Sequence, residues 1–376
     1  MARTTKTKAP QAQDAGDGPI YYCSVKASAP VQLPAHLAAE RTSALLVLAR
    51  KWANGTVLHY YFYTDPQRDG ERVTLADGTR EWRTYVGAEA QKQIVRDAFA
   101  SWKALGIGLD FKETTDRSEA EIRIGFMAGD GSWSYIGTEI LDQGRDDRTM
   151  NFGWDLRGQP DTALHEIGHT LGLPHEHQNG NSGIEWDEEA VYRDLAGPPN
   201  HWKRERTRFN IIRKLEPDSV QGSSWDPDSI MHYPFKAGLI RRPEAYSNGL
   251  RPAGGLSARD VTWIKTFYPE NPNAGMRRLE PAESQPLGVQ AGEQANFLIE
   301  PRATRKYKIQ TFGACDTQVV LFEQVGGDWR FLESDDDSGE DRNATLQLKL
   351  FQGREYVLRI RLYFSQGSGE TAVMMW

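Results

Sequence analysis

Four of the chain's eight histidines lie within the short segment TALHEIGHTLGLPHEHQ at 162–178. His165 and His169 are four residues apart, so on an α-helix both imidazoles lie on one face and can reach a single ion. Glu166 sits beside the first of them. A zinc ion held by neutral imidazoles with one open position lowers the pKa of a bound water, and a neighbouring carboxylate can take that water's proton. This spacing therefore predicts the chemistry of peptide hydrolysis.

The residues after the second histidine extend the same pattern. Gly172 permits the left-handed backbone that ends a helix, and Pro174 cannot continue one, so the chain turns back and can deliver His175 as a third ligand. H-E-x-x-H alone occurs by accident on many amphipathic helices, but the glycine and the third histidine are independent requirements of one site. His177 meets no such requirement, and we expect it to be exposed to solvent or packed behind the ligands.

These motifs resemble those of a known family. HEIGHTLGLPH fits the metzincin pattern H-E-x-x-H-x-x-G-x-x-H, and the Glu176 that follows makes it similar to the astacin branch. SIMHYPF at 229–235 is similar to the astacin Met-turn, and GSWSYIG at 131–137 resembles the edge strand that pairs with an extended substrate, here Trp133, Ser134 and Tyr135. The segment 46–270 has no cysteine, whereas animal astacins carry disulfides there. The resemblance is therefore closer to bacterial-type astacin-like or matrixin-like proteases.

The resemblance implies a role for each matching residue. Glu166 is the implied general base and acid, Met231 the Met-turn residue beneath the metal, and Tyr233 a metal ligand that can swing away and stabilise the oxyanion. Taken alone, Met231 would be a core residue and Tyr233 a half-buried strand residue. Glu176 pairs in this family with the amino terminus released when a pro-segment is removed. The implied zinc ligands are His165, His169 and His175.

Two cysteines stand apart from these motifs. Cys23 and Cys315 lie in different expected domains, which excludes a disulfide framework and disfavours a single bridge. Cys23 lies upstream of the first catalytic strand, where such enzymes keep their pro-segment, so its thiolate could occupy the open zinc position and keep the enzyme latent. The alternative is a small buried, unreactive cysteine, because PIYYCSVKAS lacks the surroundings of the matrix-metalloproteinase cysteine switch. By resemblance, the mature chain would begin near Ser43, just beyond Arg41.

Composition limits the classes of function. The chain has 376 residues and a net charge of −7, which argues against nucleic acid as the main partner. No apolar run is long enough to span a membrane, and SALLVLA at 43–49 is too short and too far from the start for a signal peptide. We therefore expect a zinc endopeptidase acting on proteins or peptides, extracellular although no signal peptide is visible. The alternatives are an inactive zinc-containing binding or adhesion protein, and a zinc amidase or cell-wall hydrolase.

The order of elements predicts an α+β metzincin domain followed by an all-β sandwich. A strand from Val57, a helix over 88–105 and several further strands precede the histidine helix, which gives a mixed sheet with packed helices. A closing helix over 256–269 has Ser257 as N-cap with Asp260 three residues later. The expected divisions are a disordered tail and possible pro-segment at 1–45, the catalytic domain at 46–270, a linker at 271–282 and the sandwich at 283–376.

The last part of the chain shows short alternating strands separated by turn residues, the pattern of a β-sandwich. It resembles the pre-peptidase-type domains that accompany secreted bacterial proteases. The loop SDDDSGEDRN at 334–343 clusters carboxylates that suit calcium. The interpretation we favour there is a solvated acidic turn, because the spacing follows no defined calcium loop. The calcium candidates would be Asp335, Asp336, Asp337 and Asp341.

Overall fold

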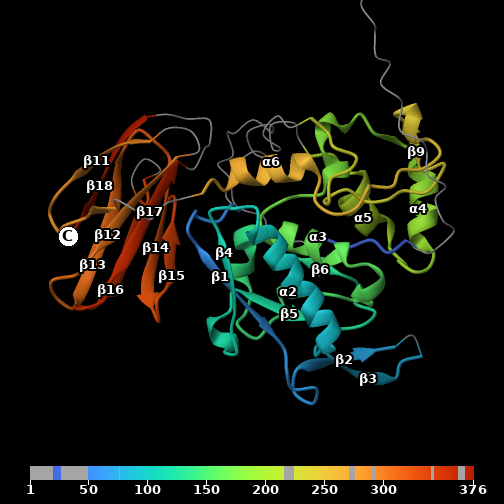
Figure 1. Ribbon diagram of the computed structural model, residues 1–376, viewed down its shortest axis with the longest axis horizontal. Coiled ribbons are helices and arrows are strands. Elements are labelled where there is room, and N and C mark those ends of the chain that lie inside the picture. Colours follow the sequence, from blue (N-terminus) through green and yellow to red (C-terminus); the bar gives the residue numbers. More distant parts are fainter. Residues whose placement is uncertain are drawn as a thin grey trace, which may run out of the picture.

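The computed structural model describes residues 20–26, 50–75, 77–215, 224–270, 276–289, 293–339, 343–362 and 369–376. The expected start of a mature chain near Ser43 and most of the expected disordered tail lie outside these residues, whereas Cys23 lies within them. The described chain forms two parts, a mixed α and β part and an all-β part, which lie side by side (Figure 1). This arrangement confirms the fold class expected from the sequence.

A five-stranded sheet organises the first part, in the order β4-β1-β5-β7-β6. Its central strands are parallel, and β6 pairs antiparallel with β7 at one edge. All but the first residue of β1 are buried, as expected for a strand covered on both faces. A separate hairpin of β2 (Gly70–Thr74) and β3 (Arg80–Thr84) extends away from this sheet. The sheet strands are β4 (Asp110–Glu113), β1 (Val57–Phe62), β5 (Ile122–Gly125), β7 (Met150–Asn151) and β6 (Trp133–Ser134).

Two helices pack against each other on this sheet, α2 (Glu89–Lys103) and the histidine helix α3 (Asp161–Thr170). Both were predicted from the sequence. Trp102 of α2 is fully buried in the core, and its indole Nε1 donates to the Leu164 carbonyl at 3.1 Å, which fixes one helix against the other. On α3, a Cβ at Gly168 would lie 2.4 Å from the Met231 sulfur. The glycine therefore allows the loop that carries Met231 to approach the helix closely.

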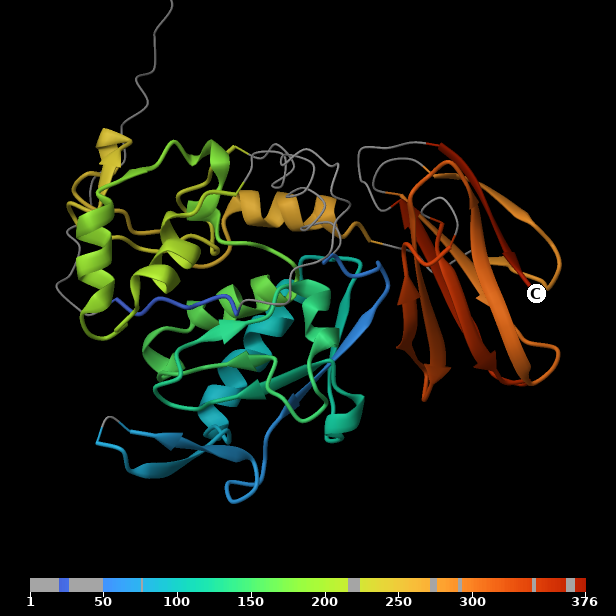
Figure 2. The same cartoon turned by 180° about the vertical axis from the view of Figure 1, so that it is seen from behind.

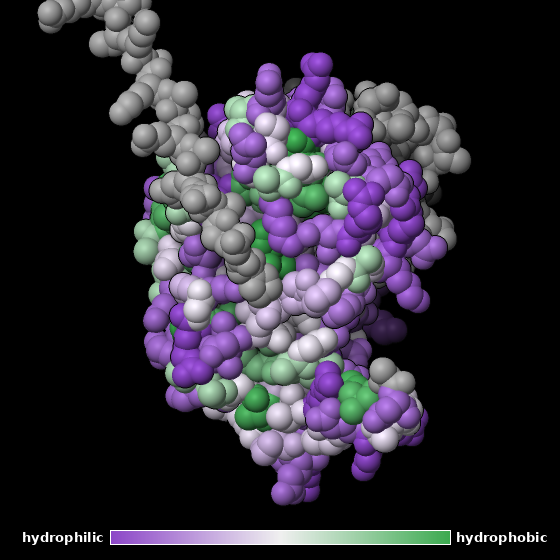
Figure 3. All heavy atoms as spheres, turned by 90° about the vertical axis from the view of Figure 1, so that its right-hand side faces the viewer, coloured by the Kyte–Doolittle hydropathy of each residue, from purple (hydrophilic) through white to green (hydrophobic). Residues whose placement is uncertain are grey.

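The chain after α3 builds a second layer around its own apolar cluster, on the side of the cleft away from the sheet (Figure 1). The face that carries α4 and β9 is mostly hydrophilic, with hydrophobic side chains in small separate groups (Figure 3). The predicted cap of α6 is present, because Ser257 Oγ accepts from the Asp260 amide and Asp260 accepts from the Ser257 amide. The layer contains β8 (Glu185–Trp186), α4 (Glu188–Ala196), α5 (Arg204–Thr207), the π-helical η6 (Arg208–Ile212) and β9 (Ile240–Arg242). The later helix α6 (Ala258–Phe267) instead buries Ile264 and Phe267 in the main core of the first part.

Short 3-10 helices connect the longer elements of the first part. They are η1 (Arg117–Glu119), η2 (Gly137–Asp142), η3 (Leu156–Gly158), η4 (Glu176–Gln178), η5 (Gly180–Ser182) and η8 (Glu244–Tyr246). Among the helices of the described ranges, none combines the length and apolar character that crossing a bilayer requires.

The second part is the predicted β-sandwich, with two sheets in the orders β10-β12-β17-β14-β15 and β11-β18-β13-β16. The strand β10 lies within the segment expected to be a linker and instead pairs with β12, and the neighbouring Leu279 is buried in the sandwich core. The strands are β10 (Arg277–Arg278), β11 (Gln285–Val289), β12 (Gln294–Ile299), β13 (Arg305–Gly313), β14 (Thr317–Val325), β15 (Asp328–Asp335), β16 (Thr345–Leu350), β17 (Tyr356–Leu362) and β18 (Gly369–Met375).

The two parts meet along the segment that leads into β1 (Figure 2). The guanidinium of Arg359 is buried and donates to the Asn54 carbonyl, and the Asn54 amide donates to Gln294 Oε1 at 3.0 Å. Arg361 donates to the Lys51 carbonyl at 2.7 Å. Side chains of the sandwich therefore hold the beginning of the first part by hydrogen bonds to its main chain.

Candidate metal centre and cleft

Four buried side chains bring their donor atoms to one point, all within 4.8 Å of one another. Two imidazoles come from successive turns of α3, and the third follows Gly172, which has the predicted left-handed backbone with φ of 91°. The fourth donor is the Cys23 sulfur, which lies 3.0, 3.7 and 3.2 Å from the Nε2 atoms of the three histidines in chain order. Three imidazoles and a sulfur at such distances form a donor set that suits zinc. The four are Cys23, His165, His169 and His175.

Hydrogen bonds at the far side of each imidazole aim its Nε2 at this point. His165 Nδ1 lies 2.7 Å from the Ile230 carbonyl, and His169 Nδ1 lies 2.8 Å from the Leu173 carbonyl. A donor N–H on that side fixes the tautomer that leaves Nε2 free to bind a metal. Burial lowers the pKa of His165 to about 4, so the imidazole is neutral at physiological pH. The side chains are therefore both oriented and protonated as metal ligands need to be.

Glu166 stands next to these donors, beside the Cys23 thiol. Its side chain is fully buried, and neither carboxylate oxygen has a hydrogen-bond partner among the described residues. Burial raises its pKa well above the ordinary value of a carboxylic acid. A buried carboxylate without hydrogen bonds is costly, and such groups concentrate where a site binds something else. The residues present therefore fit a bound metal ion with a water beside the carboxylate.

Tyr233 reaches the same point from the Met-turn segment. Its hydroxyl lies 2.6 Å from His175 Nε2 and 2.8 Å from the Cys23 sulfur, and it donates to the Cys23 carbonyl at 2.8 Å. Its ring stacks on His177 with the centroids 4.7 Å apart. His177 is buried, and its Nε2 lies 2.9 Å from the Asn210 carbonyl. Of the two alternatives for His177, exposure to solvent is wrong and packing behind the donors is correct.

The segment 20–26 lies across the cleft and meets the sheet edge. The Ser24 amide donates to the Ser132 carbonyl at 3.1 Å, while the Tyr135 amide points inward and donates to the Thr149 carbonyl of the sheet at 3.2 Å. Alternate residues of the edge therefore face the cleft, as antiparallel pairing requires. The backbone groups of Ser132 and Ser134 face the cleft, whereas those of Trp133 and Tyr135 pair with the sheet.

Residues that the sequence did not single out hold the other side of this segment. The amide side chain of Asn200 accepts from the Tyr22 amide at 3.1 Å and donates to the Ile20 carbonyl at 2.9 Å. Asn210 accepts from the Val25 amide at 2.9 Å. Both asparagines lie in this second layer, far in sequence from the segment 20–26. Their stretches, GPPNHW and RFNIIR, carry no motif that could have revealed this role.

The cleft around the donors has a volume of about 680 Å³. Ile20 and Tyr21 line it, with Tyr21 against Trp154 at a centroid distance of 5.2 Å. Glu166 and Tyr233 form part of the same wall. The cleft therefore extends from the donors along the covering segment.

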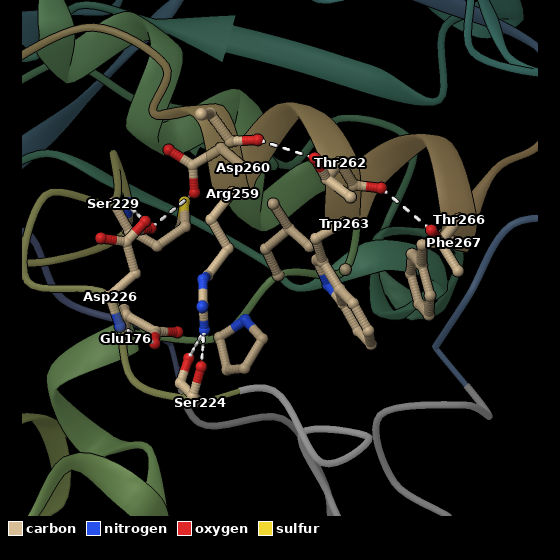
Figure 4. Close-up of a pocket in the computed structure, with 15 residues that line it drawn as sticks. Glu176, Ser224, Asp226, Ser229, Arg259, Asp260, Thr262, Trp263, Thr266 and Phe267 are labelled. Carbon is tan, nitrogen blue, oxygen red and sulfur yellow. Dashed lines mark hydrogen bonds between the residues drawn. The ribbon is translucent and has the colours of Figure 1, made fainter. Parts of the chain in front are cut away.

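A second cavity of about 600 Å³ lies beyond the Met-turn and is lined by α6 residues, among them Trp263 and Phe267 (Figure 4). Glu176, the predicted partner of a new amino terminus, forms part of its wall. The Glu176 carboxylate accepts from the Asp226 amide at 2.9 Å and from Asn179 Nδ2 at 3.1 Å. The sequence therefore singled out a residue that borders a cavity distinct from the cleft.

The acidic loop of the sandwich uses its first carboxylate for local structure. Asp335 Oδ2 accepts from the amides of Ser338 and Thr345 at 3.2 and 2.6 Å. Burial and the neighbouring carboxylates raise the pKa of Asp336 to about 6. Asp341 lies outside the described residues. Among those residues, the only group of three or more metal-type donors is the one around Cys23, so calcium at this loop is not supported.

Comparisons with known proteins agree with this geometry. Residues 81–242 match the family Astacin (Peptidase family M12A). Over 144 residues the chain is 31% identical to Metalloendoproteinase 1-MMP of Arabidopsis thaliana, which is 33% of this chain and 39% of that protein. Over 98 residues it is 36% identical to serralysin of Photorhabdus laumondii, which is 23% of this chain and 20% of that protein. The chain thus spans less than half the length of these curated relatives.

The solved structure of myroilysin is 29% identical, with a TM-score of 0.49 over 60% of this chain and 98% of that chain. The family match covers the segment that carries α2, the edge strand and all three histidines. The histidine motif lies on the helix and turn that it requires. The segment at 81–242 is therefore astacin-like, with the metzincin histidine motif on its helix and turn.

Proposed function

We propose that the chain is a zinc-dependent endopeptidase that is made in a latent form. The observation that carries the proposal is the convergence of three neutral imidazoles beside a buried carboxylate without a hydrogen-bond partner among the described residues. A zinc ion held by His165, His169 and His175 would supply a Lewis acid that polarises the scissile carbonyl and makes water acidic.

Glu166 is placed to move the proton. As the oxygen of the attacking water forms its bond to the carbonyl carbon, the carboxylate takes the proton and later passes it to the leaving amine. Burial raises the pKa of Glu166 and so favours acceptance of this proton, and it keeps bulk water from competing for the proton. The hydroxyl of Tyr233 supplies a hydrogen-bond donor for the carbonyl oxygen as it becomes negative.

The sheet edge supplies the substrate-binding surface in this proposal. A peptide that lies extended beside β6 can form main-chain hydrogen bonds with Ser132 and Ser134, whose backbone groups face the cleft. The Ser24 amide already uses the Ser132 carbonyl in this way. Main-chain pairing is indifferent to sequence, so side-chain preference must come from the walls of the cleft.

Latency rests on the position of Cys23. Its sulfur takes the place among the three imidazoles where a fourth ligand of zinc would lie, and a thiolate there excludes water. Without a metal, burial raises the pKa of this thiol, but a bound cation reverses that effect, because a coordinated thiol loses its proton. A cut between Cys23 and Trp52 would free the segment to leave.

Glu176 would receive the amino terminus that such a cut creates. The Lys51 ammonium packs over the ring of Phe267 at 4.8 Å, and Phe267 lines the cavity that Glu176 borders. A terminus near Ser43 would be about eight residues from Lys51, a reach of up to about 26 Å. The new ammonium group would offer Glu176 a charged partner in a buried setting. We also propose that the protease acts outside the cell. A site that stays covered until export protects the cell that makes it.

The test is Glu166→Gln, with exposed Glu185→Gln as the matched control. In protein cut upstream of Trp52, Glu166→Gln should keep one zinc ion and lose about two to four orders of magnitude in turnover, because the amide cannot accept the proton. The control should retain activity, and a chelator should abolish it. Peptides, glycans and amidase substrates are tested in parallel. Near wild-type turnover by Glu166→Gln would refute the mechanism, and activity on glycans or simple amides alone would refute the endopeptidase assignment.

A further inference from the structure

The side chain of Tyr22 fills a pocket beside the metal donors, and we propose that this pocket is the subsite that selects an aromatic side chain of the substrate next to the scissile bond. The inference rests on the proposed endopeptidase function and adds the class of peptide that it cuts. We call this space the Tyr22 pocket, and its walls are Trp202, Tyr233 and Phe235.

The Tyr22 pocket is enclosed and lined by rings. Tyr22 is 2% exposed, whereas its neighbour Tyr21 is 38% exposed. The Tyr22 ring lies edge-on to Tyr233 at a centroid distance of 5.2 Å and stacks on Phe235 at 5.8 Å. Such ring pairs favour an aromatic occupant beyond its burial alone. Of the two adjacent tyrosines, only Tyr22 therefore occupies a space that discriminates between side chains.

A neighbouring side chain binds the backbone on both sides of this position. Asn200 accepts from the Tyr22 amide and donates to the Ile20 carbonyl, so one amide group satisfies two backbone groups of the covering segment. Neither bond depends on the identity of the side chain that enters the pocket. A substrate in the same place can form the same two hydrogen bonds. Its side chain then contacts the aromatic rings of the Tyr22 pocket.

The Tyr22 pocket lies one residue away from the reacting centre. The sulfur of Cys23, the next residue, lies 3.0 to 3.7 Å from the three imidazole nitrogens. In a substrate the scissile carbonyl must lie at this point. A side chain in the Tyr22 pocket therefore belongs to a residue that directly flanks the scissile bond.

The Tyr22 pocket suits phenylalanine better than tyrosine. The Tyr22 hydroxyl is buried and has no hydrogen-bond partner among the described residues. The nearby carboxylate of Asp194 is engaged by the Lys236 ammonium at 2.6 Å. A buried hydroxyl without a partner loses its hydration and gains nothing in return. We therefore expect the order phenylalanine, tyrosine, then small or charged side chains.

The experiment uses the full chain, loaded with zinc and cut between Cys23 and Trp52. Peptides with Phe, Tyr, Leu, Ala or Asp at each position near the cut are digested, and the cleaved bonds are identified by mass spectrometry. We expect kcat/KM for Phe to exceed that for Ala at least tenfold at one position flanking the scissile bond. Trp202→Leu should remove most of this ratio, mainly by lowering kcat/KM for the Phe peptide. Trp82→Leu, on the distant hairpin, is the matched control and should leave the ratio unchanged.

A second readout measures binding without hydrolysis. The same Phe and Ala peptides are titrated against cut Glu166→Gln protein, where we expect at least fivefold tighter binding of the Phe peptide. This measurement and the wild-type digestion decide the question even if Trp202→Leu fails to fold. Hydrolysis with no aromatic preference, or equal binding of the two peptides, would overturn the subsite and leave the protease intact. No hydrolysis of any peptide would refute the proposed function and the subsite with it.

Discussion

Replacing Cys23 by serine tests the latency proposal directly, and Cys315→Ser supplies the matched control. Cys315 lies in the sandwich, far from the three histidines. Its sulfur lies 3.7 Å from the Glu370 carbonyl. Serine has nearly the shape of cysteine, but its hydroxyl is a poor zinc ligand. The exchange therefore removes one interaction and leaves the covering segment otherwise unchanged.

The expected rise in activity follows from the share of zinc binding that one of the four donors contributes. Structural zinc sites with four protein ligands contribute about 10 to 16 kcal/mol to folding, so one donor accounts for about 3 kcal/mol. That corresponds to a change of about a hundredfold in the ratio of open to covered cleft. We expect the activity of uncut Cys23→Ser to rise about a hundredfold over that of the uncut wild type, up to the limit set by the cut enzyme.

The covering segment should not leave completely in this variant. Tyr22 remains buried in its pocket, and the segment keeps its bonds to Asn200, Asn210 and the Ser132 carbonyl. Burying an aromatic side chain contributes about 2 to 3 kcal/mol. The double change with Tyr22→Ala should therefore approach the activity of the cut chain.

The assay is chelator-sensitive peptide hydrolysis by uncut protein, with intact mass confirming that no cleavage has occurred. Wild type and Cys315→Ser should share a low activity. If the uncut wild type is as active as the cut chain, or if Cys23 titrates as a free thiol in the zinc-loaded protein, the reasoning is wrong and Cys23 is structural.

Three further predictions follow from the same contacts. Tyr233→Phe should lower kcat more than it raises KM, because the lost hydrogen bond forms mainly in the transition state; a pure KM effect would assign Tyr233 to substrate binding. Chelation should lower Tm and make Cys23 reactive toward a thiol reagent while Cys315 keeps its reactivity, as measured by labelling and mass spectrometry; an unreactive Cys23 would contradict metal ligation. Burial and the charge of Arg361 lower the pKa of Lys51 to about 7. Between about pH 7 and 10 the unfolded chain therefore binds a proton that the folded chain lacks, so the free energy of unfolding should rise with pH by about 2 to 4 kcal/mol. In denaturant unfolding, the free energy of unfolding of Lys51→Met should change less with pH over this range.

The parts of the fold that the sequence revealed depend on local rules. The helix that carries His165 and His169 follows from residue spacing and from the glycine that ends it. The cap of α6 follows from Ser257 and Asp260, and the sandwich strands follow from alternation of apolar and polar residues. In each case the residues that decide the structure lie within a few positions of one another, so one sequence contains the whole signal.

The parts that the sequence did not reveal depend on contacts between distant segments. His177 looked unconstrained because its partners, the Asn210 carbonyl and the ring of Tyr233, lie more than thirty residues away. The partnership of Asn200 with Ile20 and Tyr22 spans about 180 residues. Asparagine at such places is typical of any turn, so no local pattern separates a main-chain clamp from an ordinary loop residue.

The junction with the sandwich explains how a cut could free the cleft without loosening the domain. Trp52 is buried, and its Nε1 donates to the Thr170 carbonyl at the end of the histidine helix at 2.8 Å. Its amide donates to the Tyr268 hydroxyl at 3.1 Å, and that hydroxyl donates to the Leu171 carbonyl.

On the other side of this segment, the sandwich residues Arg359 and Gln294 hold the backbone of Asn54. A cut upstream of Arg50 removes none of these bonds, because all of them lie after it in the chain. The covering segment then loses its covalent tether, and with it the high effective concentration that holds Cys23 at the donors. The helix that presents the histidines keeps its anchor at Trp52. In the proposed latent enzyme, the sandwich would thus keep the cut end folded, so that release of the segment would leave the site stable.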